Sequence, residues 1–413
     1  MWMLDKAMIH GTPGELIGCP DCGQIQSLPI IAQLSIAECV RCRRGLAGAT
    51  RASVDAPLAF SMSALLLLLP SSLSPLMALS AFGRSRHDWL PSGAEMLWSA
   101  GYELLAIVVS LFSIAIPFVY LSLMIWVLAL ARAGRASECG PPFRWALRLR
   151  YWAMLEVYLV GCCVAYSRLQ SIGTTQVEVG GWCLLGATAA MFLLSLSLDE
   201  RSIWNAMRPR MEPPGDGPMI DCDACGLVLD ARREQSHCPR CAGILRRRKP
   251  YSMGNTLALV LTGYLLYVPA NLLPMIRIER FGRYEPNTIL SGVRALIAAN
   301  LWPLAVIVFT ASILVPLIKL VGLSAMLTFT RWHSSRWLIG RTRLYRFIEA
   351  IGRWSSIDLF MISILVALVQ FGTLTSVRPD EGAVAFAAVV IVTMLASRSF
   401  DPRIMWDATD GAA

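Results

Sequence analysis

The sequence of 413 residues is poor in charged side chains. Only 16% of its residues are Asp, Glu, Lys or Arg, well below the roughly 25% of a typical soluble domain, whereas 55% are hydrophobic. This scarcity excludes an ordinary soluble domain and indicates an integral membrane protein. Histidine is scarce as well, with four copies in the chain, and only His237, beside Cys238, stands where it could bind a metal.

Several common sequence signals are also absent. No cleavable signal peptide is apparent, and the first long apolar run, which begins near Ala56, is expected to direct membrane insertion itself. No G-x-x-x-x-G-K-[ST] motif is present, so ATP is not expected to be the direct energy source. The net charge of +9 comes without a nucleic-acid-binding pattern. We therefore expect no nucleic-acid partner, and attribute the excess of arginine to cytoplasmic loops.

The chain contains an internal repeat. The segment PSSLSPL at 70–76 matches PANLLPM at 269–275, which lies 199 positions later. Further along each half the offset becomes 202, which pairs Trp152 with Trp354. Matches at a nearly constant offset indicate a tandem duplication.

Each half contains four apolar stretches, each near the ~20 residues that a helix needs to cross a bilayer. They lie at 56–80, 101–131, 151–171 and 179–198 in the first half, and at 254–276, 301–330, 355–376 and 382–398 in the second. An even number of spans gives both halves the same topology. The loops between the second and third spans are rich in arginine, which places them in the cytoplasm. The predicted fold is an α-helical polytopic membrane protein built as a duplicated four-helix bundle.

Eight of the twelve cysteines form two sets of paired Cys-x-x-Cys motifs. They are Cys19, Cys22, Cys39 and Cys42 in the first half, and Cys222, Cys225, Cys238 and Cys241 in the second. Two such turns bring four thiolates around one ion in a tetrahedron. We interpret each set as a small zinc ribbon with a structural role, because four thiolates leave the ion no open position for catalysis.

Three other interpretations of these cysteines compete with zinc. Disulfides need an oxidising compartment, whereas these segments fall on the side predicted to be cytoplasmic. A dithiol redox centre needs one reactive pair and not two paired sets. An iron site of the rubredoxin type uses the same four thiolates and stays open as an alternative.

The repeat and the ribbons together predict four domains. They are an N-terminal zinc ribbon at 1–52, a first four-helix transmembrane domain at 53–207, a second zinc ribbon with a basic linker at 208–250, and a second four-helix transmembrane domain at 251–413. In this arrangement each ribbon precedes the bundle of its own half.

Lys319 places a charge inside an apolar span. A lysine at the bilayer centre costs about 2.5–3.5 kcal/mol on insertion scales, so it usually faces a protein interior. Pro316 has no amide hydrogen and deprives the carbonyl of Ser312 of its helical partner, and Ser312 shares a helix face with Lys319. The next two spans add further polar side chains. We predict one polar cluster in the second bundle, formed by Lys319, Asp358, Ser312, Ser355 and Thr393.

The first half differs at these positions. Tyr120 stands at the position of Lys319, and Glu156 at that of Asp358, so the carboxylate occurs in both halves and the lysine in one. We include Glu156 among the candidate transport residues. The alternative is that Lys319 extends toward the cytoplasmic headgroups and Asp358 is an ordinary interfacial acid.

The sequence resembles the paraquat-inducible protein A (PqiA/LetA-like) family. The resemblance rests on CPDCG at 19–23, CDACG at 222–226, VPLIK at 315–319, IGRWSSID at 351–358 and the paired closing segments LDERSIW at 198–204 and FDPRIMW at 400–406. It implies an inner-membrane protein of a Gram-negative bacterium. It further implies a periplasmic mammalian-cell-entry (MCE) domain protein as partner, which forms a tunnel across the envelope, and lipid as substrate.

Three functions follow as hypotheses. The first is a lipid transporter subunit without enzymatic activity, with protonation of Asp358, coupled to Lys319, as one candidate driver. The second is a scaffold without transport activity, which anchors the tunnel through its bundles and docks a cytoplasmic partner through its zinc ribbons. The third is a membrane thiol oxidoreductase, against which about two zinc ions per chain would count.

Overall fold

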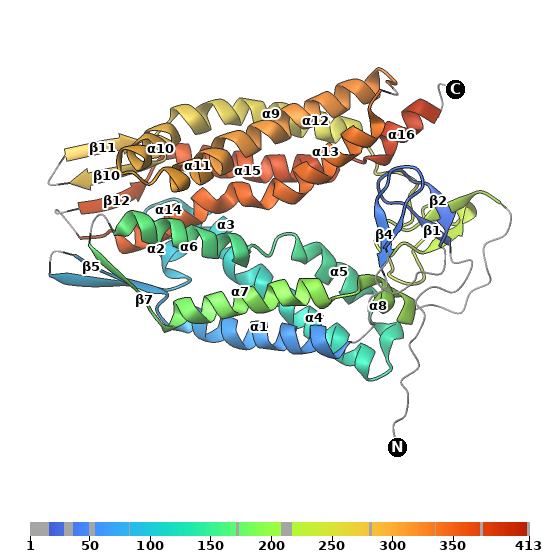
Figure 1. The fold of residues 1–413 in the computed structure, drawn as a ribbon, viewed down its shortest axis with the longest axis horizontal. Helices are drawn as coiled ribbons and strands as arrows, with labels where there is room; N and C mark the ends of the chain where they lie inside the picture. Colours follow the sequence, from blue (N-terminus) through green and yellow to red (C-terminus); the bar gives the residue numbers. More distant parts are fainter. Residues whose placement is uncertain are drawn as a thin grey trace.

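The computed structural model describes residues 16–28, 36–48, 54–81, 83–170, 173–207, 217–280, 283–334, 336–371 and 375–410. Two helical bundles lie side by side, with the cysteine-bearing ribbons at one end and two small β-sheets at the other (Figure 1). We call these the ribbon end and the sheet end. The predicted domain boundary between 52 and 53 lies outside the described residues, and the one after 207 lies at their edge.

Eight helices in the described part of the chain are long and apolar enough to cross a membrane, four in each half, which confirms the predicted fold class. Four of them are single helices: α1 (Asp55–Leu73), α7 (Val179–Ser197), α9 (Ser252–Leu272) and α15 (Glu381–Ser399). The second span of each half is α3 (Glu103–Ser110), η1 (Leu111–Ala115) and α4 (Ile116–Arg132), or α11 (Trp302–Phe309), η4 (Thr310–Leu314) and α12 (Val315–Arg331). The third is α5 (Gly140–Arg150) and α6 (Leu155–Leu169), or α13 (Leu338–Ile351), η5 (Gly352–Ser356) and α14 (Ile357–Leu368).

Proline explains the break in each second span. Pro117 and Pro316 lie in the first turn of α4 and α12 and cannot donate a backbone hydrogen bond. The preceding turn widens into a π-helix, so that the amide of Val315 bonds to the carbonyl of Thr310, five residues back. Such π-turns are frequent at functional sites.

Several predicted span limits were wrong. The first spans were expected to reach 80 and 276, but the helices end at Leu73 and Leu272, because a proline follows each end and cannot continue the helix. The third spans begin earlier than predicted, at Gly140 and Leu338. The arginine-rich segments expected to be loops form α5 and α13, since their apolar side chains recur on one face and pack inward.

The β-strands at the sheet end were not predicted. A hairpin after each first span and a strand after each third span form two antiparallel three-stranded sheets, in the order β6-β5-β7 and β11-β10-β12. Their strands are β5 (Met77–Ala81), β6 (Arg84–Asp88), β7 (Thr174–Val177), β10 (Ile276–Arg280), β11 (Arg283–Asn287) and β12 (Thr375–Pro379). A short helix follows each hairpin, α2 (Ser92–Ser99) or α10 (Ile289–Ala298).

The ribbon end contains short elements. They are β1 (Leu16–Gly18), β2 (Ile25–Ser27), β3 (Ile36–Glu38), β4 (Gly45–Gly48), β8 (Met219–Asp221), β9 (Val228–Asp230), η2 (Ala136–Glu138), η3 (Ala231–Arg233), α8 (Glu200–Ala206) and α16 (Arg403–Asp410). Strands β1–β4 form two hairpins in the first ribbon, and β8 pairs with β9 in the second.

Helix α14 joins the two bundles. All of its residues are buried, and it packs against α6 and α2 of the first half. Small residues permit the close approach: a Cβ atom built on Gly161 of α6 would lie 3.1 Å from the Cβ of Phe360, and one on Gly93 of α2 would lie 2.9 Å from the carbonyl oxygen of Ser363. The seam between the halves is therefore a packed interior.

Candidate metal centres and transport site

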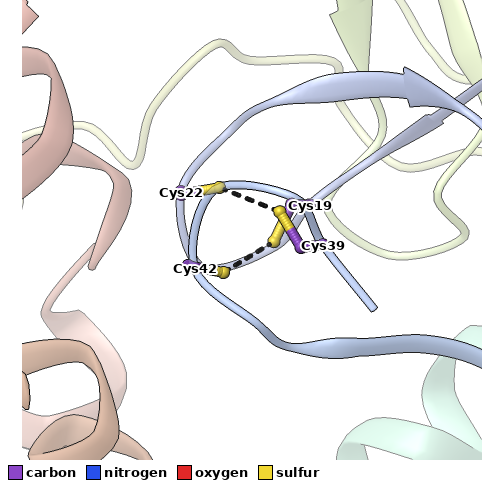
Figure 2. A group of neighbouring side chains, drawn as sticks. All are labelled: Cys19, Cys22, Cys39 and Cys42. Carbon is purple, nitrogen blue, oxygen red and sulfur yellow. Dashed lines mark hydrogen bonds between the residues drawn. The ribbon is translucent and has the colours of Figure 1, made fainter. Parts of the chain in front are cut away.

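The eight predicted ligands form two compact sulfur clusters. Within each set of four cysteines, all Sγ atoms lie within 4.8 Å of one another and all four side chains are buried. Figure 2 shows the first set, in which the sulfur atoms of two turns face one another. The shortest sulfur–sulfur distances are 3.4 Å between Cys19 and Cys42 and 3.5 Å between Cys222 and Cys241.

The backbone repeats one turn geometry at all four motifs. In each, the residue after the second cysteine donates its amide to the carbonyl of the first, at 2.8–2.9 Å. This turn needs a left-handed residue, and φ is +73° at Gly23 and +68° at Gly226. Arg43 and Ala242 occupy the same position with φ of 55° and 53°, although a side chain is unfavourable there.

Both clusters fit a tetrahedral metal ion. Four sulfur atoms at the usual Zn–S distance of about 2.3 Å would stand about 3.8 Å apart, close to the 3.4–3.6 Å observed between the nearest pairs. These eight cysteines are free thiols and not disulfides. The donor set suits zinc, and iron binds the same ligands.

Lys319 lies wholly inside the second bundle. Its side chain has no solvent exposure, and its Nζ donates to the carbonyl oxygen of Gly352 at 2.8 Å, Ser355 Oγ at 3.1 Å and Thr393 Oγ1 at 3.4 Å. These partners lie on η5 and α15. The alternative in which Lys319 extends to the headgroup layer is therefore wrong.

Asp358 lies one helical turn beyond Ser355. It accepts a short hydrogen bond from Ser312 Oγ, which joins α14 to the π-turn η4. Its other oxygen, Oδ1, is buried without a hydrogen-bond partner in the described structure. In the described part of the chain, no ion pair of 4.0 Å or less joins Asp358 to Lys319. The five predicted residues form two adjacent groups, one around the ammonium and one around the carboxylate.

A protein-family model matches the chain twice, once in each half. Residues 54–208 and 253–410 each match the model described as paraquat-inducible protein A. The chain belongs to the paraquat-inducible protein A family. The two matched segments hold the two bundles, which supports the duplication; the cysteine motifs lie outside both segments.

Relatives in this PqiA family cover nearly the whole chain. The intermembrane transport protein PqiA of Escherichia coli (strain K12) is 32% identical over 96% of this chain and 97% of its own length. A probable intermembrane transport protein of Haemophilus influenzae is 27% identical over 98% and 99%. The lipophilic envelope-spanning tunnel protein A of E. coli K12 is 30% identical over 96% and 92%. No solved structure matches the chain.

Sequence reasoning missed Arg168 in this PqiA family member. Arg168 is on α6 of the first bundle and reaches across the seam, since a Cβ atom built on Gly292 of α10 would lie 3.6 Å from Arg168 Nη2. A signal was available, because Arg168 lies inside the predicted span 151–171 and a charge within a span usually faces protein.

Glu156 lies apart from the other candidate residues. It forms an ion pair of 3.7 Å with Arg353 of η5, and both side chains are about 30% exposed. Arg353 adjoins Gly352, the backbone acceptor of Lys319. Glu156 therefore takes part in a contact between the halves, beside the lysine group but outside it.

A second buried acid lies at the sheet end. Asp88 is the last residue of β6, has no solvent exposure and accepts a short hydrogen bond from Ser92 Oγ. Burial raises the pKa of Asp88 to about 7, and the hydrogen bond from Ser92 opposes this change. The second half has Asn287 at the same place, 199 positions later.

Proposed function

We propose that this protein is the inner-membrane subunit of a lipid transport system, which passes lipids between the inner membrane and a periplasmic MCE tunnel protein. Two relatives support this proposal by their names, which describe intermembrane transport and a lipophilic envelope-spanning tunnel. The relatives compared are named as transport proteins and not as enzymes. The proposed orientation, with the ribbons in the cytoplasm, rests on the arginine-rich loops.

The observation that carries a transport role is the buried polar group of the second bundle. A scaffold needs no ammonium and no carboxylate in its interior, where each costs several kcal/mol to desolvate. Here Lys319 and Asp358 are both buried, and each binds the broken part of the neighbouring span: Lys319 binds η5, and Asp358 binds η4. Interrupted helices with exposed backbone groups are typical of transporter sites.

Asp358 can respond to protonation at this place. As a carboxylate it only accepts, and it holds Ser312 of η4; a protonated carboxyl group also donates. In the described structure no hydrogen-bond donor occupies its Oδ1, so a proton can bind to that oxygen without displacing another group. Gain or loss of that proton would change the contact between η4 and α14, and so the packing of two adjacent spans.

A matched pair of serine variants tests the proposal. Ser312→Ala removes the hydrogen bond to Asp358, whereas Ser113→Ala removes the equivalent hydroxyl of the first half, which donates to the carbonyl of Val109 in its own span and to no other group in the described part of the chain. Transfer of fluorescent phosphatidylethanolamine from proteoliposomes to a purified MCE tunnel protein is the readout. We expect a loss of at least tenfold for Ser312→Ala and Asp358→Asn, and normal transfer for Ser113→Ala.

The scaffold hypothesis predicts another pattern. Transfer would be equal in all three variants at equal protein levels, whereas loss of a ribbon cysteine would abolish assembly with the tunnel protein. That result would overturn the transport proposal.

A further inference from the structure

Each ribbon is docked on the bundle of the opposite half. The four thiols of the first ribbon share an apolar core with Leu323, Ile348 and Trp406, which belong to α12, α13 and α16 of the second half. The second ribbon lies against α5 of the first half, since a Cβ atom built on Gly140 would lie 1.8 Å from the carbonyl oxygen of Arg240. The sequence predicted ribbons that precede their own bundles; in space they are exchanged.

Arg346 of α13 connects the first metal centre to the second bundle. Its Nε lies 2.5 Å from Asp21 Oδ2, and its Nη2 lies 3.3 Å from the carbonyl oxygen and 3.4 Å from the Sγ of Cys42. Asp21 stands between Cys19 and Cys22, and its carboxylate is 2% exposed. One guanidinium thus reaches both a buried acid and a metal ligand.

Arg144 of α5 occupies the equivalent position in the other half. It lies 202 positions before Arg346, the offset that also relates Trp152 to Trp354. A Cβ atom built on Gly243 would lie 3.1 Å from Arg144 Nη1 and 3.3 Å from Cys241 Sγ, so the guanidinium borders the second centre. The two arginines stand at equivalent positions of the two halves, although each ribbon lies on the bundle of the other half.

Each ribbon also has a contact with its own half. Arg201 of α8 donates to the carbonyl oxygen of Leu46 in the first ribbon at 3.4 Å, and Arg403 of α16 lies 2.6 Å from Asp223 Oδ1 in the second. Both ribbons therefore bridge the two bundles at the ribbon end. At the sheet end the two sheets stay separate.

The electrostatics link these contacts to metal loading. A divalent ion with four thiolates has a net charge of −2, which a neighbouring guanidinium stabilises, and loss of such an outer contact typically lowers metal affinity about 10–100-fold. The attraction is reciprocal, so the loaded centre holds the arginine and its helix. Residue 346 precedes Gly352 by six positions on the same broken span, and Gly352 accepts from Lys319.

We propose that Arg346 and Arg144 are positioning residues, through which each loaded metal centre braces the third span of the opposite bundle. Metal loading then keeps the two bundles together at the ribbon end. This contact acts on the fold of the membrane domain, whether or not the protein transports lipid.

The test uses the purified full-length protein in detergent, loaded with zinc. Hydrogen–deuterium exchange is followed by mass spectrometry before and after an EDTA-type chelator removes the metal. Arg346→Ala is compared with Arg343→Ala, a matched control that removes an exposed arginine from the same helix. Zinc release is followed with a colorimetric chelator.

For Arg346→Ala we expect one of two zinc ions per chain to be lost about tenfold faster, together with faster exchange in 338–351. Arg144→Ala should affect the other zinc ion and the segment 140–150. Arg343→Ala should match the wild type.

Two results would overturn the proposal. One is zinc release from Arg346→Ala that equals release from Arg343→Ala. The other is metal removal from the wild type that speeds exchange within the ribbons alone and leaves α5 and α13 unchanged. Because the second measurement uses the wild-type protein, it holds even where a variant folds poorly.

Discussion

Replacing Lys319 with methionine tests whether this lysine serves transport or only the stability of the fold. Methionine has a similar length and no charge, so it fills the same space without the cost of burying an ammonium. The neighbouring hydroxyls keep other partners: Ser355 Oγ donates to the carbonyl oxygen of Gly352 at 3.0 Å, and Thr393 Oγ1 to that of Val390 at 3.1 Å. Loss of the lysine therefore leaves few polar groups unpaired.

The expected change in stability follows from these contacts. Replacement of a buried charge by an apolar side chain of similar volume is often neutral or stabilising by about 1–4 kcal/mol, and each acceptor that loses a bond costs about 1 kcal/mol. Lys319 has three acceptors, so we expect Lys319→Met to lie between about 2 kcal/mol less stable and about 1 kcal/mol more stable than the wild type, with lipid transfer reduced to background.

Two assays on one preparation decide the matter. Thermal unfolding in detergent reports stability, and transfer of labelled phospholipid from proteoliposomes reports transport. Tyr120→Phe, at the equivalent position of the first half, serves as the control and should leave transport unchanged. Full transport by Lys319→Met would refute the role of the lysine, and a large drop in melting temperature would show that its hydrogen bonds are structural.

Three further predictions concern stability. Asp88→Asn, which copies Asn287, should stabilise the protein above pH 7 by up to about 4 kcal/mol. The reason is that a carboxyl group with a raised pKa contributes fully to folding stability below pH 4 and loses this contribution as the pH rises through 7. Melting temperatures from pH 4 to 8 should then vary less than in the wild type. Ala242→Gly should strengthen its ribbon by about 1 kcal/mol, because φ is 53° there, and zinc release against denaturant should shift upward; an unchanged midpoint would contradict the strain. Gly140→Ala should detach the second ribbon and expose it to protease, since the added Cβ would lie 1.8 Å from the carbonyl oxygen of Arg240. The control Gly254→Ala should have no effect, because no atom lies within 4 Å of its added Cβ.

The sequence alone determined the features that depend on local pattern. Eight apolar stretches, the duplication and the two cysteine sets were each visible as composition or spacing, because membrane insertion and metal turns are encoded within short segments. The burial of Lys319 also followed, since an ammonium in a span must find a protein environment.

The tertiary structure decided which segments meet. The strands at the sheet end were not predicted, because β5 and β10 follow a proline break and pair with residues about a hundred positions later. Spacing could not show that Arg168 of α6 reaches Gly292 of α10 in the other half, or that Glu156 binds Arg353 of η5. Both contacts depend on how the two bundles pack against each other.

The exchange of the ribbons shows the same limit most plainly. Order along the chain placed each cysteine set before its own bundle, whereas Arg346 contacts the first set from the opposite bundle and Arg144 borders the second. The fit of side chains at the ribbon end, such as Arg346 with Asp21, accompanies this docking. The sequence determined what the parts are, and packing between distant parts determined how they are joined.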